Sequence, residues 1–142
     1  MKISTKIRYG MRAMVELARS KREEPVMLGI IAKNQNLSEK YLEQLFTLLR
    51  NGGLVKSERG AKGGYRLAKD PDNITALEIF EAMNGPFELV DCSINPGSCK
   101  RSSECETIEL WKELSDKIKE TLSSKTLSDL AQKGKEPLDY SI

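Results

Sequence analysis

The 142-residue chain contains no histidine, and it has no cysteine outside one segment of fourteen residues. Without an imidazole, and without a recognisable pair of nucleophile and base, there is no catalytic constellation, so we predict that the protein is not an enzyme. No apolar run approaches the roughly 20 residues of a membrane span. The charged N-terminus lacks the features of a signal peptide. We therefore expect a cytoplasmic protein with no membrane partner.

The three cysteines are Cys92, Cys99 and Cys105. In a reducing cytoplasm an odd number of thiols favours metal or redox chemistry over structural disulfides. Their spacing matches neither the paired knuckles of zinc ribbons nor the motifs of ferredoxins. Thiolates are nevertheless soft ligands that suit iron–sulfur clusters, zinc or copper(I). Three alternatives to an iron–sulfur cluster stay open: redox-active thiols without metal, a zinc site with a carboxylate as its fourth ligand, and no role at all.

The charge is distributed unevenly along the chain. Residues 1–69 contain fifteen Lys and Arg against six Asp and Glu, a net charge of +9, whereas residues 70–142 contain eight against fifteen, a net charge of −7. A positive half attracts phosphates and an acidic half does not. An ordinary solvated surface would account for the charge as well, so the sequence motifs have to decide.

The pattern of apolar residues predicts a mainly α protein. Helices are expected over residues 5–20, 28–33 and 38–50, followed by short strands over 54–57 and 64–68 that are joined by a Gly-rich, basic loop. This order makes a winged helix-turn-helix with a two-stranded wing. A fourth helix opens with the capping box Thr75-x-x-Glu78 and ends at Asn84-Gly85-Pro86. A long helix over 104–122 and a short one over 126–132 complete the chain.

Three regions follow from these elements. Residues 1–70 are expected to form the winged helix-turn-helix DNA-binding domain. Residues 71–103 hold the connecting helix and the cysteine-rich loop, and residues 104–142 hold a dimerisation helix and a polar tail. Apolar residues recur in the long helix at spacings of three and four, as in a helix–helix seam. They are Ile108, Trp111, Leu114 or Ser115, Ile118 and Leu122.

A recognition helix enters the major groove with its N-terminal residues on the base edges. Gln44 is suited to pair with adenine, Glu43 to accept from cytosine N4, and Lys40 to meet a phosphate. The alternative for each residue is an ordinary solvated helix face. The full set of candidates on this helix is Ser38, Glu39, Lys40, Tyr41, Glu43 and Gln44, of which Tyr41 is also typical of a core position.

The wing and the first helix supply the other candidate contacts. Arg59 lies at the predicted wing tip, where a guanidinium can enter a narrow minor groove. Lys62 in the same loop, and Lys6, Arg8 and Tyr9 in the first helix, are candidate phosphate contacts.

Three stretches carry a resemblance to a known family. Residues 37–67 read LSEKYLEQLFTLLRNGGLVKSERGAKGGYRL, residues 6–10 read KIRYG, and residues 110–116 read LWKELSD. Together they resemble the IscR, NsrR and CymR family of bacterial winged-helix regulators over nearly the whole chain. The resemblance implies a homodimer joined through the long helix and bound to a pseudo-palindromic operator in double-stranded DNA. It also implies that Glu43, Gln44 and Arg59 read the DNA.

The resemblance also bears on the cysteines. The IscR and NsrR branches bind an iron–sulfur cluster through three cysteines placed almost like these, whereas the CymR branch lacks them. This implies that Cys92, Cys99 and Cys105 are cluster ligands, and we expect a [2Fe–2S] cluster, with [4Fe–4S] as the alternative. The protein would then be a transcription regulator that senses iron–sulfur supply, nitric oxide or redox state. The alternative is a cluster-free repressor of the same fold that senses a thiol reaction, zinc or an effector.

The fourth ligand of such a cluster is open. Ile108 stands where IscR-like proteins have a histidine, Arg8 stands where NsrR-like proteins have an acid, and the first gap between cysteines is one residue longer. A backbone group, a small thiol or a residue of the other subunit could serve. A carboxylate oxygen close to the cysteines could also serve, and the candidates are Asp91, Glu104, Glu106 and Glu109.

Two other functions fit the sequence less well. A small iron–sulfur electron carrier would leave the recognition helix and the wing without a use. A non-specific structural DNA binder would not need polar side chains at the base-reading positions.

Overall fold

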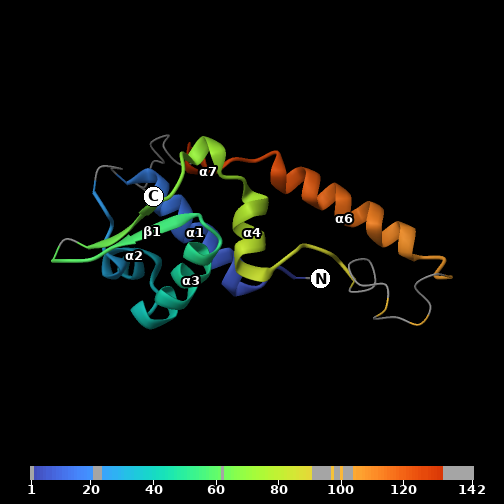
Figure 1. The fold of residues 1–142 in the computed structure, drawn as a ribbon, viewed down its shortest axis with the longest axis horizontal. Helices are drawn as coiled ribbons and strands as arrows, with labels where there is room; N and C mark the ends of the chain where they lie inside the picture. The colour runs from blue at the N-terminus through green and yellow to red at the C-terminus, as the bar shows by residue number, and fades with distance from the viewer. Residues whose placement is uncertain are drawn as a thin grey trace, which may run out of the picture.

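The computed structural model describes residues 2–20, 24–61, 63–90, 97, 100 and 104–132. Helices α1 to α4 and α7 form one body, the wing projects from one end of it, and α6 extends from the opposite end (Figure 1). The predicted architecture, mainly α with a two-stranded wing and a long C-terminal helix, is confirmed. The elements are α1 (Thr5–Arg19), α2 (Leu28–Gln35), α3 (Glu39–Asn51), β1 (Val55–Glu58), β2 (Gly64–Leu67), η1 (Pro71–Asn73), α4 (Ala76–Asn84), α6 (Ile108–Ser123) and α7 (Leu127–Gln132).

Helix α3 is amphipathic, and its sequence accounts for its boundaries. Ser38 caps it, because its hydroxyl accepts the backbone N–H of Tyr41 at 3.1 Å. Asn36 takes the left-handed conformation at φ 56°, which ends α2 and turns the chain into α3. One face of α3 is buried almost completely, through Leu42, Leu45, Phe46 and Leu49.

The wing is a short antiparallel pair that rests on a third segment. The register runs from Val55 opposite Leu67 to Glu58 opposite Gly64. On its other side Tyr65 exchanges two backbone hydrogen bonds with Val26, at 2.8 and 2.9 Å. Gly64 is required there, because a Cβ would overlap the backbone of Val26. The sequence predicted the two strands to within one residue but did not predict the Val26 pairing.

The start of α4 differs in one respect from the predicted capping box. The Thr75 hydroxyl accepts the Glu78 N–H at 3.1 Å, as expected. The reciprocal half of the box is wrong, because the Glu78 carboxylate pairs with Lys69 at 2.8 Å and Thr75 instead forms an isolated β-bridge with Thr126.

Helix α7 returns to the body and anchors the C-terminal end of α6. The Leu127 N–H donates to the Ile74 carbonyl at 2.7 Å, and the Ala76 N–H donates to the Lys125 carbonyl at 2.8 Å. The Arg19 guanidinium donates to the Ala131 carbonyl at 2.8 Å. Backbone bonds and the buried side chain of Leu127 therefore hold the end of α6 to the start of α4.

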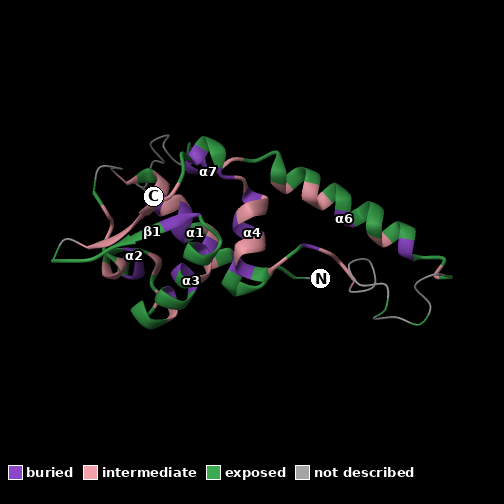
Figure 2. Ribbon diagram, in the orientation of Figure 1, coloured by how far each residue is buried: buried purple, intermediate pink, exposed green. Residues whose placement is uncertain are grey.

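Helix α6 begins later than predicted. The expected start near residue 104 is wrong, because the helix runs over Ile108–Ser123 and the apolar repeat begins only at Ile108. Figure 2 shows α6 as mostly exposed, and its buried residues are Ile108 and Ser115. Within the described part of the chain, none of the helices has the length and apolar character that a bilayer crossing requires.

Helices α3 and α4 meet at a close contact that can be tested. A Cβ added at Gly52 would lie 2.8 Å from the Cβ of Ala82. We expect Gly52→Ala to lower the free energy of unfolding by about 1–3 kcal/mol, the usual cost of overpacking. Urea denaturation measures it. The double variant Gly52→Ala/Ala82→Gly should recover part of the loss, and strictly additive losses would contradict the contact.

Candidate functional site

The exposed face of α3 carries most of the predicted base-reading residues. Burial of the apolar face turns Lys40, Glu43 and Gln44 toward solvent, and Ser38 is exposed at the start of the helix. They are side by side because residues three and four apart share a helix face. A helix that enters a major groove needs polar, exposed side chains in its first two turns.

The two predicted tyrosine contacts have a packing role in the structure. The rings of Tyr9 and Tyr41 meet edge to face with centroids 6.3 Å apart. The guanidinium of Arg12 lies 5.3 Å from the centre of the Tyr9 ring. Both tyrosines are half-buried against the core. They hold α1 to α3, and such a pair contributes roughly 0.5–1.5 kcal/mol beyond its burial.

The wing is held at a defined position relative to α3. The rings of Phe46 and Tyr65 have centroids 4.6 Å apart, so the buried face of α3 packs directly against β2. Arg59 is exposed in the turn between the strands, where Gly60 has φ 111°. Lys62, predicted as a phosphate contact, lies outside the described residues.

A cleft of about 510 Å³ separates α3 from the wing, and it is lined by carboxylates. They belong to Glu39, Glu43 and Glu58, and Glu58 pairs with Arg66 at 2.6 Å. Because carboxylates repel phosphate, we expect the contacts with the phosphate backbone of DNA to come from basic residues outside this cleft. Glu58 was not predicted as a part of this surface, because the predicted first strand ended at residue 57. In the structure Glu58 is paired with Gly64 at the end of the hairpin.

A mainly apolar groove of about 810 Å³ runs between α1 and α6. Arg8 lines this groove, whereas Lys6 is exposed on α1 without lining it. Of the predicted phosphate contacts on α1, Arg8 therefore faces this groove, whereas Tyr9 meets Tyr41 of α3. The apolar residues of the groove are Ile3, Ile7, Met11, Val15, Phe80, Ile118, Leu122 and Leu130.

The predicted seam of α6 divides into two sets. Ile118 and Leu122 line the groove along α1, Ile108 is buried and Trp111 is half-buried. Leu114 points outward and is 40% exposed, together with Leu110 at 54%. Leu110 was not predicted as a part of the seam, although its spacing of four from Leu114 was the available signal.

Of the three cysteines, the structure describes Cys105. Its half-buried thiol lies just before α6, 3.2 Å from the Thr107 hydroxyl. Cys92 and Cys99 lie outside the described residues, as does Asp91. The candidate carboxylates Glu104, Glu106 and Glu109 are exposed. By residue type, the Cys105 thiol is a donor that the irons of iron–sulfur clusters take.

The chain is similar to known proteins over nearly its whole length. Residues 3–133 match the Rrf2 family, described as an iron-dependent transcriptional regulator. The chain is 50% identical over 131 residues to the HTH-type transcriptional regulator CymR of Bacillus subtilis, a match that spans 92% of this chain and 90% of that protein. It is 38% identical over 141 residues to the regulator IscR of Escherichia coli, spanning 99% of this chain and 86% of that protein.

Solved structures show the same two relationships. The structure of CymR, titled the global cysteine regulator of B. subtilis, superposes with a TM-score of 0.77 at 47% identity and covers 92% of this chain and 96% of that chain. T. potens IscR superposes with a TM-score of 0.77 at 40% identity and covers 96% of this chain and 90% of that chain.

The exposed face of α3 generates a matched pair of substitutions. We expect Gln44→Ala to relax base preference at one position of the bound DNA, with a loss of about 1–3 kcal/mol in discrimination. Lys40→Ala should weaken binding to all sequences alike and lower the salt slope by about 1, because it loses a phosphate contact. Fluorescence anisotropy over a salt series and a set of single-base operator variants measures both. Lys112→Ala on α6 is the control, and identical profiles for all three variants would contradict these roles.

Proposed function

This chain belongs to the Rrf2 family of transcriptional regulators, and we propose that an iron–sulfur cluster held by Cys92, Cys99 and Cys105 controls its binding to an operator. It binds DNA, as the family does, and it is not an enzyme. We propose that it acts in the cytoplasm, where the operator is.

One observation carries the proposal of a cluster. All cysteines of the chain fall within fourteen residues, and the last of them, Cys105, lies three residues before the start of α6. Three thiolates so close in sequence supply the negative, soft donor set that iron–sulfur clusters take. The family description as iron-dependent, and the relation to IscR, support it.

The residues have separate tasks in this proposal. The three cysteines would hold the cluster, which we propose is of the [2Fe–2S] type, with [4Fe–4S] as the alternative. When bound, the cluster supplies a centre that oxidants or nitric oxide can alter. The contacts of the cysteine residues with the rest of the protein determine which helices such a change would affect. The Cys105 thiol lies beside the first turn of α6, so one of the proposed ligands is next to the start of that helix.

We propose that the functional unit is a homodimer joined through α6. Leu110 and Leu114 are exposed apolar residues on this helix, and the groove between α1 and α6 offers a second apolar surface beside it. A second copy of α6 would bury both surfaces. Such a dimer presents two copies of α3 to a pseudo-palindromic operator, in which successive major grooves lie about 34 Å apart.

Control by the cluster requires that its state alter the dimer. We propose that ligation of the cysteine segment sets the relative position of the two copies of α3. The cluster-loaded and cluster-free proteins then differ in affinity or in preferred operator.

The second candidate is a cluster-free regulator that senses a thiol reaction, zinc or an effector. The observation that favours it is the 50% identity to CymR, whose structure is titled a cysteine regulator. Thiols in such a protein would act by forming a disulfide on oxidation.

Anaerobic purification separates the two candidates. For a cluster we expect broad absorption between about 320 and 460 nm with equal iron and sulfide contents. The variant Cys105→Ser should lose most of the bound iron, while Ser123→Ala, outside the cysteine segment, should keep it. Circular dichroism checks that both variants fold.

Operator binding completes this test. The loaded and the cluster-free protein should differ in affinity across a salt titration. Equal binding would contradict control by the cluster, and a colourless protein that stays iron-free after anaerobic reconstitution would favour the cluster-free regulator.

A further inference from the structure

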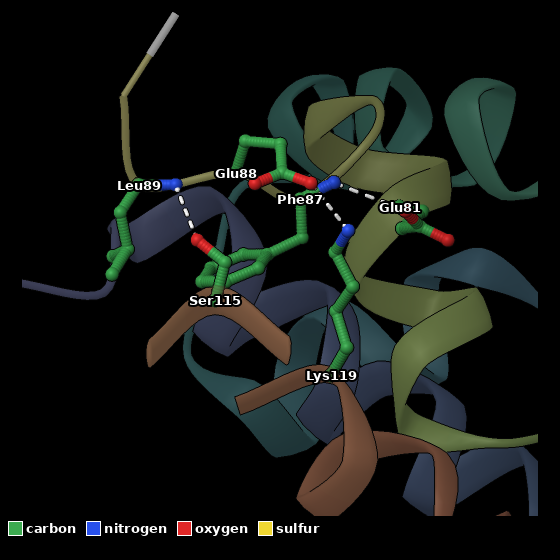
Figure 3. A network of polar contacts seen from close by, with 6 residues as sticks. All are labelled: Glu81, Phe87, Glu88, Leu89, Ser115 and Lys119. Atoms are coloured by element: carbon green, nitrogen blue, oxygen red, sulfur yellow. Dashed lines mark hydrogen bonds and ion pairs between the residues drawn. The ribbon is translucent and has the colours of Figure 1, made fainter. Parts of the chain in front are cut away.

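The segment that leads from α4 toward the cysteines is fastened to two helices by polar contacts (Figure 3). This segment, residues 85–90, is called the strap below. The Phe87 N–H donates to the Glu81 carboxylate on α4 at 3.0 Å. On the other side, the Leu89 N–H donates to the Ser115 hydroxyl on α6 at 3.1 Å, and Lys119 donates to the Glu88 carboxylate.

The contacts on α6 are built into an otherwise exposed helix. Ser115 is 0% exposed, although its neighbours Leu114 and Asp116 face solvent. A buried hydroxyl in mid-helix is useful where it meets a backbone group that an apolar side chain would leave unsatisfied. The hydrogen bond to Glu88 raises the pKa of Lys119 despite partial desolvation, so its ammonium group stays charged at neutral pH. We call Ser115, Lys119, Glu88 and the Leu89 backbone N–H the clamp.

The strap itself is packed onto α4. Phe87 is 8% exposed, and its ring meets that of Phe80 edge to face with centroids 5.2 Å apart. Because Phe87 also bonds to Glu81, the strap follows α4 rather than moving freely beside it. Helix α4 in turn packs on α3, where Ala82 faces Gly52. The clamp is thus the polar joint in a continuous path from α6 to α3.

Helix α6 is held at a second point. Its C-terminal end is fixed to the start of α4, because the Leu127 N–H donates to the Ile74 carbonyl and the Lys125 carbonyl accepts the Ala76 N–H. Two points of attachment define the direction of a rigid rod. Sixteen residues make a rod about 24 Å long, so a tilt of about 10° moves its far end by about 4 Å. That displacement is close to the 3.4 Å rise of one base pair in DNA.

We propose that Ser115 and Lys119 are positioning residues that, through the strap, fix the angle between α6 and the winged helix and so set the separation of the two recognition helices in the dimer. The inference rests on the proposed dimer. Leu89 precedes Cys92 by three residues, so the clamp is also close in sequence to the cysteine segment. A change in that segment reaches α6 and α4 together through this joint.

Full and half operators test the inference. The probes are a duplex selected by the wild-type protein from a random library, the same duplex with one half-site scrambled, and versions with the centre lengthened or shortened by one base pair. Ser115→Ala and Lys119→Met should each weaken binding to the full operator at least tenfold. Binding to the half-site duplex should not change, because each winged helix reads its half-site alone. Both variants should also lose the wild-type preference for one spacing.

Matched variants separate positioning from folding. Lys112→Met removes an exposed lysine seven residues earlier on the same helix, away from the face of Leu110 and Leu114. Lys112 pairs with Glu109 at 4.0 Å, and the variant should leave both affinities unchanged. Lys119→Arg keeps the cation and should restore the spacing preference. Lys119 is partly exposed, so its variants should fold even if Ser115→Ala does not, and urea denaturation checks this.

The outcomes are distinct. Equal losses on full and half operators, or an unchanged spacing preference in Ser115→Ala and Lys119→Met, would overturn the clamp's positioning role alone. A wild-type protein that binds full and half operators equally would overturn the dimer on which the inference rests.

Discussion

Burial of one face of α3 is the constraint on which the rest of this structure depends. Leu42, Leu45, Phe46 and Leu49 are withdrawn from water, and each large side chain contributes on the order of 2 kcal/mol through its burial. The opposite face must then be exposed, because a helix cannot rotate without bringing polar groups into the core. The same packing holds the wing, since Phe46 meets Tyr65 of β2.

Of the elements around α3, some pack against it and fix its position, whereas α6 projects away from it. Helices α1, α2 and α4 pack on its buried side, and the Tyr9–Tyr41 pair and the Gly52–Ala82 contact bring the backbones into fixed relation. Helix α6, in contrast, leaves the body and returns through α7 (Figure 1). A close-packed DNA-binding body and a projecting helix suit a regulator in which a change far from α3 must move a whole helix. Close-packed interiors transmit such a displacement rather than absorb it.

Most of the local structure was predictable from the sequence. Ser38 and Thr75 act as caps through hydrogen bonds that span three residues, so sequence spacing was enough to find them. The predictions failed where a partner distant in sequence decides. Val26 pairs with Tyr65 across thirty-nine positions, and Glu78 turns to Lys69 instead of completing its capping box. The ambiguity between Leu114 and Ser115 was likewise decided by the strap, which buries the serine.

The sequence by itself determined the order of elements, the polar face of α3, the basic wing and the confinement of the thiols to one segment. These follow from residue type and spacing, because helix period, turn residues and charge act over a few positions. Only the tertiary structure decided that Arg8 lies in the groove beside α6, that carboxylates line the cleft by the wing, and that Ser115 meets the Leu89 backbone. The physical reason is that burial and pairing depend on which surfaces meet, and contacts between residues far apart in the chain form only when the whole fold closes.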